Sequence, residues 1–160
     1  MSVAAEELSG LIREVHYTCR RCLDARLGQF ATSVAQWYAM RTISRNPGWS
    51  QSELARLTRS SNQAFSTLMR RLAARGFIES RTGLGRAEIP ELTPTGRVML
   101  READEIVHRV IDGAFAPLAD SERQALRAML WRVLEAEQRL RREPGATRAL
   151  PLRVSEHRQG

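Results

Sequence analysis

The stretch from Ser60 to Arg81, SSNQAFSTLMRRLAARGFIESR, constrains the fold more than any other part of the chain. Its apolar residues recur at three- and four-residue steps, which is the spacing of a helix with one buried face. The apolar face carries Phe65, Leu68, Met69, Leu72 and Gly76. The opposite face carries Gln63, Ser66, Thr67, Arg70, Arg71 and Ala74. The sequence therefore predicts a helix that is anchored to a core on one side and presents polar and basic groups on the other.

Local start and stop signals divide the region before this helix. A helix is predicted from about 32 to 46, where Asn46-Pro47-Gly48 stops it. Ser50-x-x-Glu53 forms a capping box, in which two side chains satisfy free backbone amides, and it predicts the start of a short helix. Ser60-x-x-Gln63 has the same spacing and predicts that the next helix begins directly after Ser60.

A β-hairpin is predicted after Gly76. Residues 77–81 have the composition of a strand, 82–85 that of a turn, and 86–92 that of a returning strand. Two helices, a tight connection and a hairpin make a winged helix-turn-helix, in which the hairpin is the wing.

Basic charge is concentrated in this same region. The chain has 160 residues, 25 arginines, no lysine and a formal net charge of +7. Residues 50–86 contain seven arginines and two glutamates, a net +5. Because cationic side chains release condensed counterions from phosphates and so drive non-specific affinity, this charge favours nucleic acid over an anionic membrane as partner. A GC-rich genome explains the lack of lysine equally well.

Long amphipathic helices are predicted on both sides of the winged helix. The first carries Leu8, Leu11, Ile12, Val15, Cys19, Cys22 and Leu23 on one stripe. A fifth helix starts at Thr93-Pro94, with proline at its favoured first position, and ends before Pro117. The sixth begins near Asp120-Ser121 and carries Leu126, Met129, Leu130, Val133, Leu134 and Leu140. No sheet is available to cover these apolar stripes.

The order and spacing of these motifs resemble the MarR (multiple-antibiotic-resistance regulator) family of bacterial transcription factors. The resemblance runs from about 32 to 140, and its most specific parts are SQSELA at 50–55, GFIE at 76–79 and LTPxGRxxL at 92–100. It implies a mainly α fold: a winged helix-turn-helix with a small hairpin wing, and an α-helical dimerisation domain formed by the N- and C-terminal helices. The expected division is a dimerisation region at 1–30 and 94–143, a DNA-binding region at 31–93, and a mobile C-terminal tail at 144–160.

The resemblance also implies a homodimer that binds double-stranded DNA at a pseudo-palindromic operator, with half-sites about one helical turn, or ~34 Å, apart. Base edges in the major groove are expected to meet Gln63, Ser66, Thr67 and Arg70, and phosphates to meet Arg71 and Arg75. Arg86 is expected to enter the minor groove, although Leu84 stands where the family usually has an aspartate that orients this arginine. The remaining expected DNA-binding residues are Ser61, Asn62 and Arg81.

Members of the family commonly bind a small aromatic or anionic ligand between the dimerisation and DNA-binding parts. The ligand changes the spacing of the recognition helices, so the expected function is a repressor that a ligand releases from its operator. The candidate ligand residues near that junction are His16, Arg20, Trp37, Tyr38 and Arg41. For each of them a purely structural role, as a core aromatic or an interface histidine, is the alternative.

Cys19-Arg20-Arg21-Cys22 raises a second possibility. Neighbouring arginines favour the thiolate that oxidants attack, so a redox-responsive regulator is an alternative. Both cysteines lie on the apolar stripe, however, where a free cysteine is usually a small buried hydrophobe. A thiol oxidoreductase is disfavoured because such cysteine pairs normally lie at a helix start in a βαβ context. An architectural DNA-binding protein without an effector is the other alternative.

Several classes of protein are disfavoured by what the sequence lacks. The three histidines, His16, His108 and His157, have no cysteine or carboxylate at metal-ligand spacing, so no metal or other cofactor is expected. No nucleophile motif or glycine-rich phosphate loop is present, and the chain is not expected to be an enzyme. The N-terminus has no signal-peptide pattern, and no apolar run approaches the ~18 residues of a membrane span. A cytoplasmic protein is expected.

Overall fold

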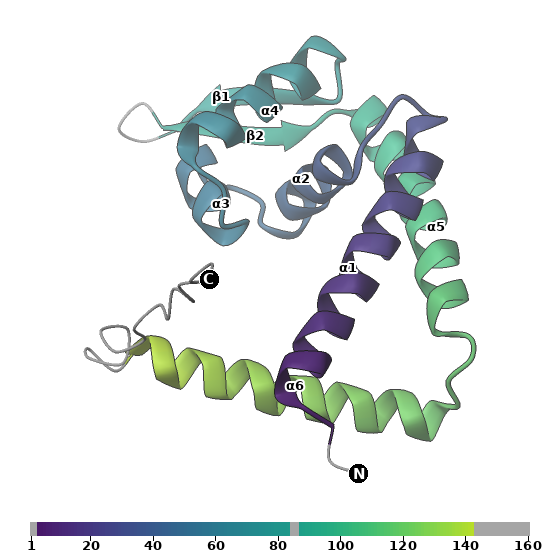
Figure 1. The fold of residues 1–160 in the computed structure, drawn as a ribbon. Coiled ribbons are helices and arrows are strands. Elements are labelled where there is room, and N and C mark those ends of the chain that lie inside the picture. Colours follow the sequence, from purple (N-terminus) through teal and green to yellow (C-terminus); the bar gives the residue numbers. More distant parts are fainter. Residues whose placement is uncertain (1–2, 84–86, 143–160) are drawn as a thin grey trace, which may run out of the picture. The chain divides into compact units, whose positions relative to one another are not determined.

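The computed structural model describes residues 3–83 and 87–142. The chain divides into two compact units after Ala114. Figure 1 labels their helices and strands. Unit 1 contains α1 (Ala5–Gly28), α2 (Val34–Arg45), α3 (Gln51–Leu57), α4 (Asn62–Ala74), β1 (Ile78–Thr82), β2 (Glu88–Leu92) and α5 (Pro94–Phe115, which ends at the boundary). Unit 2 contains α6 (Asp120–Arg142). The mainly helical fold class with a winged helix-turn-helix is confirmed, and the predicted tail at 144–160 lies outside the described residues.

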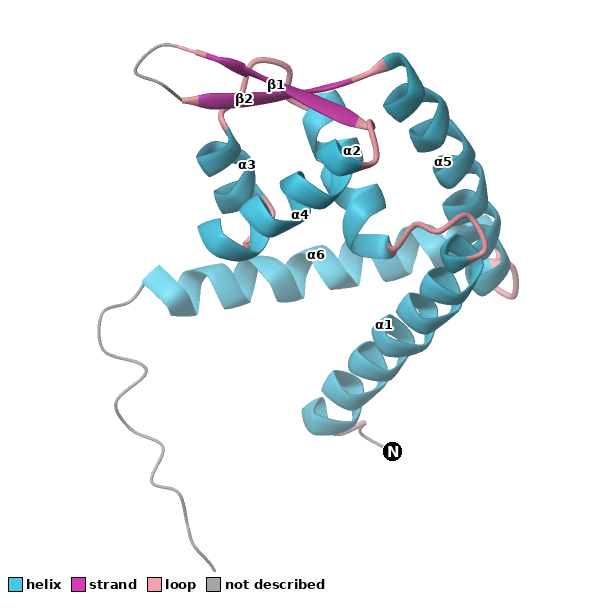
Figure 2. Cartoon of the chain, turned by 90° about the horizontal axis from the view of Figure 1, so that it is seen from above, coloured by secondary structure: helices cyan, strands magenta, loops and turns pink. Residues whose placement is uncertain are grey.

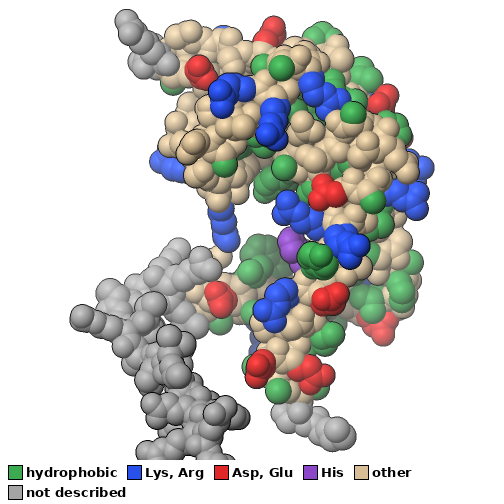
Figure 3. All heavy atoms as spheres, turned by 45° about the horizontal axis from the view of Figure 1, so that its top comes forward, with side chains coloured by type: hydrophobic (Ala, Val, Ile, Leu, Met, Phe, Trp, Pro, Cys, Tyr) green, Lys and Arg blue, Asp and Glu red, His purple; other side chains and the backbone are tan. Residues whose placement is uncertain are grey.

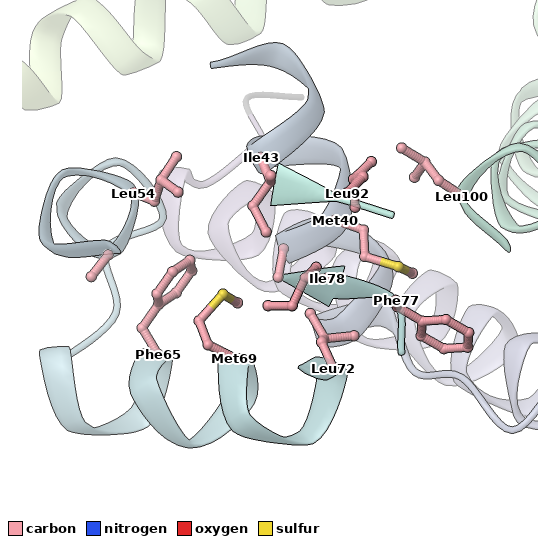
Figure 4. Close-up of a cluster of buried hydrophobic side chains, with 12 residues drawn as sticks. Met40, Ile43, Leu54, Phe65, Met69, Leu72, Phe77, Ile78, Leu92 and Leu100 are labelled. Atoms are coloured by element: carbon pink, nitrogen blue, oxygen red, sulfur yellow. The ribbon is translucent and has the colours of Figure 1, made fainter. Parts of the chain in front are cut away.

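One core holds the winged helix together. It is built from α2, α3, α4 and the hairpin, with α5 contributing at its edge, and consists mainly of Met40, Ile43, Leu54, Phe65, Met69, Leu72, Phe77, Ile78, Leu92 and Leu100. Figure 4 shows these side chains converging from the helices onto the two strands. Among the described residues, the largest fully buried side chains are Phe65, Leu27, Met40, Leu54 and Leu72, and all of these except Leu27 belong to this core. The inner face of α4 is thereby fixed, as its spacing predicted.

A second, smaller cluster joins α1 to α5. Leu23 and Leu27 from the end of α1 pack against Ala103, Ile106 and Val107 in the middle of α5. Trp37 of α2 packs against both clusters, so α2 connects the core of the winged helix to α1 and α5. The N-terminal half of α1 has no such cover within unit 1, and its apolar side chains are exposed.

The start of α4 differs by one residue from the prediction. The helix begins at Asn62, and its N-cap is Ser61, whose hydroxyl accepts from the Ala64 amide at 3.2 Å. Ser60 instead lies in the connection from α3, where its amide donates to Ala55 and its hydroxyl accepts from Thr58. The predicted Ser60–Gln63 capping box is therefore wrong. Two adjacent serines both have capping chemistry, and only the length of the turn after α3 selects between them.

The other helix and strand ends lie close to their predicted positions. α2 runs over 34–45 rather than 32–46, and its N-cap is Ser33. β1 begins at Ile78, one residue later than predicted, and pairs antiparallel with β2 so that Ile78 faces Leu92. Figure 2 shows the hairpin along one side of α2, α3 and α4. The predicted turn lies partly outside the described residues.

The end of α4 explains why a glycine precedes the hairpin. Gly76 has φ +69°, in the left-handed region that glycine adopts without strain. Its amide donates to Ala73 at 2.8 Å, and the Phe77 amide donates to Leu72 at 3.0 Å. This is a Schellman motif, which closes the helix and turns the chain directly into β1.

The predicted capping box at Ser50 is confirmed, and its contribution to the stability of the protein can be measured. The Ser50 hydroxyl and amide donate to the Glu53 carboxylate at 2.6 and 2.7 Å, and the hydroxyl also accepts from the Glu53 amide. We expect Ser50→Ala to lower the free energy of unfolding by ~1 kcal/mol, because the cap of α3 is lost. Denaturant unfolding measures this, and Ser52→Ala, an exposed neighbour in the same turn, is the control.

The same cap makes stability depend on pH. The bonds from the Ser50 hydroxyl and amide lower the pKa of the Glu53 carboxyl from its ordinary value of 4.5. A carboxyl whose pKa is lower in the folded state stabilises that state above the unfolded pKa. The stabilisation from Glu53 is therefore present at neutral pH and lost as the pH falls below about 4.5. Ser50→Ala should flatten this part of the stability–pH curve, and an unchanged curve would contradict the assignment.

Candidate nucleic-acid interface

The outward face of α4 forms one polar and basic surface. Gln63, Arg70 and Arg71 are exposed, and Ser66 and Thr67 are half-buried beside them. The Arg70 guanidinium donates to the Thr67 hydroxyl at 3.2 Å, so these two side chains lie together one turn apart. Ser61 and Asn62 are exposed at the start of the helix. Seven of the ten predicted DNA-binding residues thus come together on α4 and its N-cap.

This surface has the geometry that major-groove recognition requires. The buried side of α4 is held by Phe65, Met69 and Leu72, so the helix cannot rotate its polar side inward without exposing the core. An α-helix fits the major groove, where Arg and Gln side chains read guanine and adenine edges. Figure 3 shows arginine side chains scattered over the visible face of the molecule.

Arg75 lies apart from this surface. Its guanidinium donates to the Ala31 carbonyl in the connection between α1 and α2, and it lies 4.4 Å from the centroid of the Phe77 ring. These contacts hold the side chain against the protein, half-buried. Arg75 is therefore not part of the outward polar surface of α4.

Of the two predicted wing arginines, Arg81 lies within the described residues and Arg86 does not. Arg81 of β1 pairs with Glu91 of β2 at 2.5 Å across the hairpin, and both side chains are largely exposed. Such a pair contributes little to stability and leaves part of the guanidinium open to a phosphate. Arg86 lies outside the described residues.

The five predicted ligand residues do not form one site. Trp37 and Arg41 of α2 both bind Asp104 of α5: the Trp37 indole N–H donates to Oδ1 at 2.7 Å, and Arg41 forms a short ion pair with the same oxygen. Tyr38 is exposed, and its ring centroid lies 6.2 Å from that of Trp37. His16 and Arg20 are exposed on α1, where Arg20 pairs with Asp24 at 3.8 Å.

Asp104, which joins α5 to Trp37 and Arg41 of α2, was not predicted from the sequence to have a role. It lies between the buried Ala103 and Ile106 in the middle of α5, 67 residues from Trp37. A carboxylate beside an apolar stripe is a weak signal, because many such residues simply face water. Here it ties the winged helix to α5.

We expect Asp104→Asn to lower the free energy of unfolding by ~2 kcal/mol. The substitution removes the charge that pairs with Arg41, and a largely buried guanidinium then has no counter-ion. Denaturant unfolding measures the loss. Asp112→Asn, an exposed carboxylate on the same helix, is the control and should change stability by less than ~0.5 kcal/mol. Equal effects of the two substitutions would contradict a structural role for Asp104.

A cavity lies elsewhere, between α1 and α5. It has a volume of about 740 Å³ and is lined by Cys19, Cys22, Arg26 and Phe30 from α1 and the turn after it, and by Ile106, Arg109 and Val110 from α5. None of the five predicted ligand residues lines it. The sequence missed Arg26, Phe30 and Arg109 because they become neighbours only when α1 packs against α5.

The two cysteines are free thiols, and both line this cavity. The expectation that they are buried small hydrophobes is wrong for Cys22, which is exposed, while Cys19 is half-buried. The apolar stripe of α1 is covered in unit 1 only at its C-terminal end, so residues on that stripe are not buried by their spacing alone. Among the described residues no three His, Cys, Asp or Glu side chains are grouped as metal ligands would be.

None of the helices in residues 3–83 and 87–142 has the length and apolar content that crossing a membrane requires.

The winged helix matches a known family. The MarR family model matches residues 32–86, which run from the start of α2 to the hairpin. The chain is 26% identical over 125 residues to the HTH-type transcriptional repressor Rv2887 of Mycobacterium tuberculosis, a match that covers 77% of this chain and 90% of the relative.

Solved structures share the fold over about four fifths of the chain. MarR from E. coli, in a mutant form complexed with operator DNA, aligns with a TM-score of 0.73 at 21% identity, over 80% of this chain and 94% of that one. Rv2887 from M. tuberculosis in complex with DNA aligns with a TM-score of 0.67 at 25% identity, over 79% and 96% of the two chains. The same protein with salicylic acid gives a TM-score of 0.64 at 26% identity, over 79% and 95%. Residues 32–86 thus match the MarR family model, and the chain as a whole is similar to MarR-family regulators.

Proposed function

We propose that this chain is a homodimeric transcriptional repressor. It binds a pseudo-palindromic operator through two copies of α4 and leaves the operator when a small organic ligand binds. The observation that carries the proposal is the outward face of α4, where Gln63, Thr67, Arg70 and Arg71 project from a helix that the core holds in place. The relatives that support it are a protein named as a repressor and solved in complex with DNA, and the same protein solved with salicylic acid.

The exposed apolar side chains of the long helices support the dimer. α1 exposes Leu8, Leu11, Ile12 and Val15, and α6 exposes Met129, Leu130, Trp131, Val133 and Leu134. The α1 set recurs at helical spacing, whereas the α6 set covers a broad side of its helix, and contiguous exposed apolar surfaces of this kind mark an interface. A two-fold dimer uses the same stripe on both copies. We therefore propose that dimerisation involves residues 1–30 and 94–143, which contain α1, α5 and α6, and that residues 31–93 bind DNA.

The test is a titration with the DNA upstream of the protein's own gene, at two salt concentrations, together with a footprint. We expect two protected half-sites about one helical turn, or ~34 Å, apart. Affinity should fall steeply with salt, with a slope of about −0.9 per phosphate contacted in a plot of log K against log salt. Diffuse protection without symmetry would favour an architectural DNA-binding protein and overturn the repressor.

A further inference from the structure

Arg59 occupies a backbone position that suits glycine better than arginine. Its φ is +54°, in the left-handed region where a side chain crowds the following carbonyl oxygen. The turn between α3 and α4 is a Schellman motif: the Arg59 amide donates to the Arg56 carbonyl at 3.1 Å, and the Ser60 amide donates to the Ala55 carbonyl at 3.0 Å. The end of α4 has the same hydrogen-bond pattern, and there Gly76 stands at the corresponding position. The turn itself therefore gives no reason for an arginine at position 59.

The guanidinium of Arg59 meets no partner within the part of the chain that the structure describes. The side chain is exposed, and residues 3–83 and 87–142 offer it no hydrogen bond or ion pair. Glu53 is the only acidic residue between positions 50 and 71, and its carboxylate already accepts from Ser50. A side chain kept in a costly backbone conformation without an internal contact indicates a contact outside the chain.

The position of Arg59 relative to α4 is fixed. The turn is tied to the end of α3, where the Thr58 amide donates to the Leu54 carbonyl at 3.0 Å, and Leu54 and Ala55 are buried in the core. Arg59 stands two residues before Ser61, the N-cap of α4. When the N-terminal part of a recognition helix enters the major groove, the residues just before it lie at the edge of the groove, beside the phosphates. An arginine guanidinium matches a phosphate in charge and in geometry.

We propose that Arg59 binds a phosphate of the DNA, and that arginine is kept at this position at a cost in stability. The proposal rests on the proposed function, because it needs α4 to lie against DNA. It extends the interface from the outward face of α4 to the turn before that helix.

Three substitutions at this one position separate charge from strain. Arg59→Ala removes the cation and keeps the strain, Arg59→Gly removes both, and Arg59→Lys keeps both. We expect the alanine and glycine variants to bind the operator at least about tenfold more weakly. Their plots of log K against log salt should be shallower by about 0.9 for each copy of the contact, and lysine should retain the slope. Anisotropy titrations of the full-length protein with the DNA upstream of its own gene, at several salt concentrations, measure this.

Thermal unfolding of the same variants measures the cost in stability. Arg59→Gly should raise the melting temperature by roughly 2–4 °C, because the strain that it removes exceeds the extra entropy of glycine in the unfolded chain. Arg59→Ala should not raise it. A single substitution, Arg59→Gly, is thus expected to stabilise the protein and to weaken its binding to DNA.

Two matched controls separate these effects. Ala31, just after α1, is the other non-glycine residue with a positive φ among the described residues, at +51°. Ala31→Gly should raise the melting temperature by a similar amount and leave the salt slope unchanged, since it keeps the carbonyl that accepts from Arg75. Arg101→Ala removes an exposed arginine of α5, outside residues 31–93, and should change neither quantity.

The outcomes distinguish this proposal from the proposed function. An unchanged salt slope in Arg59→Ala, with operator binding by the wild type intact, would reject the phosphate contact alone. A melting temperature that does not rise in Arg59→Gly would reject the cost in stability. Because a phosphate contact does not depend on base sequence, the titrations are repeated with a random-sequence duplex of the same length. Equal affinity for the two duplexes, with the slope still reduced in Arg59→Ala, would reject the sequence-specific repressor alone, and no binding to either duplex would overturn both.

Discussion

Replacement of Gly96 by alanine is expected to lower the free energy of unfolding by about 3 kcal/mol, or the melting temperature by roughly 10 °C. A Cβ on Gly96 would lie 1.9 Å from the Phe77 carbonyl oxygen and 2.8 Å from its carbonyl carbon. Both are backbone atoms at the base of the hairpin, which cannot move aside as the end of a flexible side chain can. Calorimetry or denaturant unfolding measures the effect.

The close approach at Gly96 is part of a larger contact. Thr93 donates its amide to the Phe77 carbonyl at 3.1 Å and its hydroxyl to the Gly76 carbonyl at 2.7 Å, so the start of α5 lies directly on the end of α4. An added Cβ must separate them. Gly113→Ala on the same helix is the matched control. No described atom outside the helix backbone lies within 4 Å of a Cβ added at Gly113. It should leave stability unchanged or raise it by up to ~1 kcal/mol. A similar small effect of Gly96→Ala would contradict the close contact.

Arg70→Ala is expected to weaken operator binding by ~2–6 kcal/mol. A bidentate contact from arginine to guanine contributes ~1–3 kcal/mol, and a two-fold dimer loses the contact in both half-sites. If Arg70 reads a base, the loss should disappear on operators changed at one symmetric base pair, because the contact is already absent there. Anisotropy titrations of both proteins against single-base operator variants measure this.

The control for Arg70 is its neighbour Arg71, which is expected to contact phosphate. Arg71→Ala should weaken all operator variants alike and reduce the salt slope by about one for each copy of the contact. Both side chains are exposed, so neither substitution should change the free energy of unfolding by more than ~0.5 kcal/mol. A uniform loss from Arg70→Ala would make Arg70 a phosphate contact as well.

The parts of the fold that the sequence predicts correctly depend on local chemistry. The inner face of α4 follows from the spacing of Phe65, Met69 and Leu72, and the start of α3 follows from Ser50 and Glu53. The one-residue error at the start of α4 has the same origin, since Ser60 and Ser61 offer the same capping group and the choice depends on the turn before them.

The parts that the sequence does not predict depend on distant partners. The sequence does not show that Trp37 and Arg41, two predicted ligand residues, both bind Asp104, which lies more than sixty residues away. It also does not show that the guanidinium of Arg75, a predicted phosphate contact, lies against Ala31 and Phe77. Cys22 looks buried because its stripe is apolar, but burial needs a covering element, and none covers it within unit 1. The helical spacing of apolar residues predicts on which side of a helix a side chain lies. It does not predict which distant residues that side chain contacts.

The contact between Arg75 and Ala31 has a mechanical consequence. Arg75 is the C-cap of α4, and Ala31 directly follows Gln29 and Phe30, two residues of the cavity wall. One guanidinium thus joins the C-terminal end of α4 to the segment that forms part of the cavity wall, so a displacement of Ala31 would be transmitted to α4 without passing through the buried core.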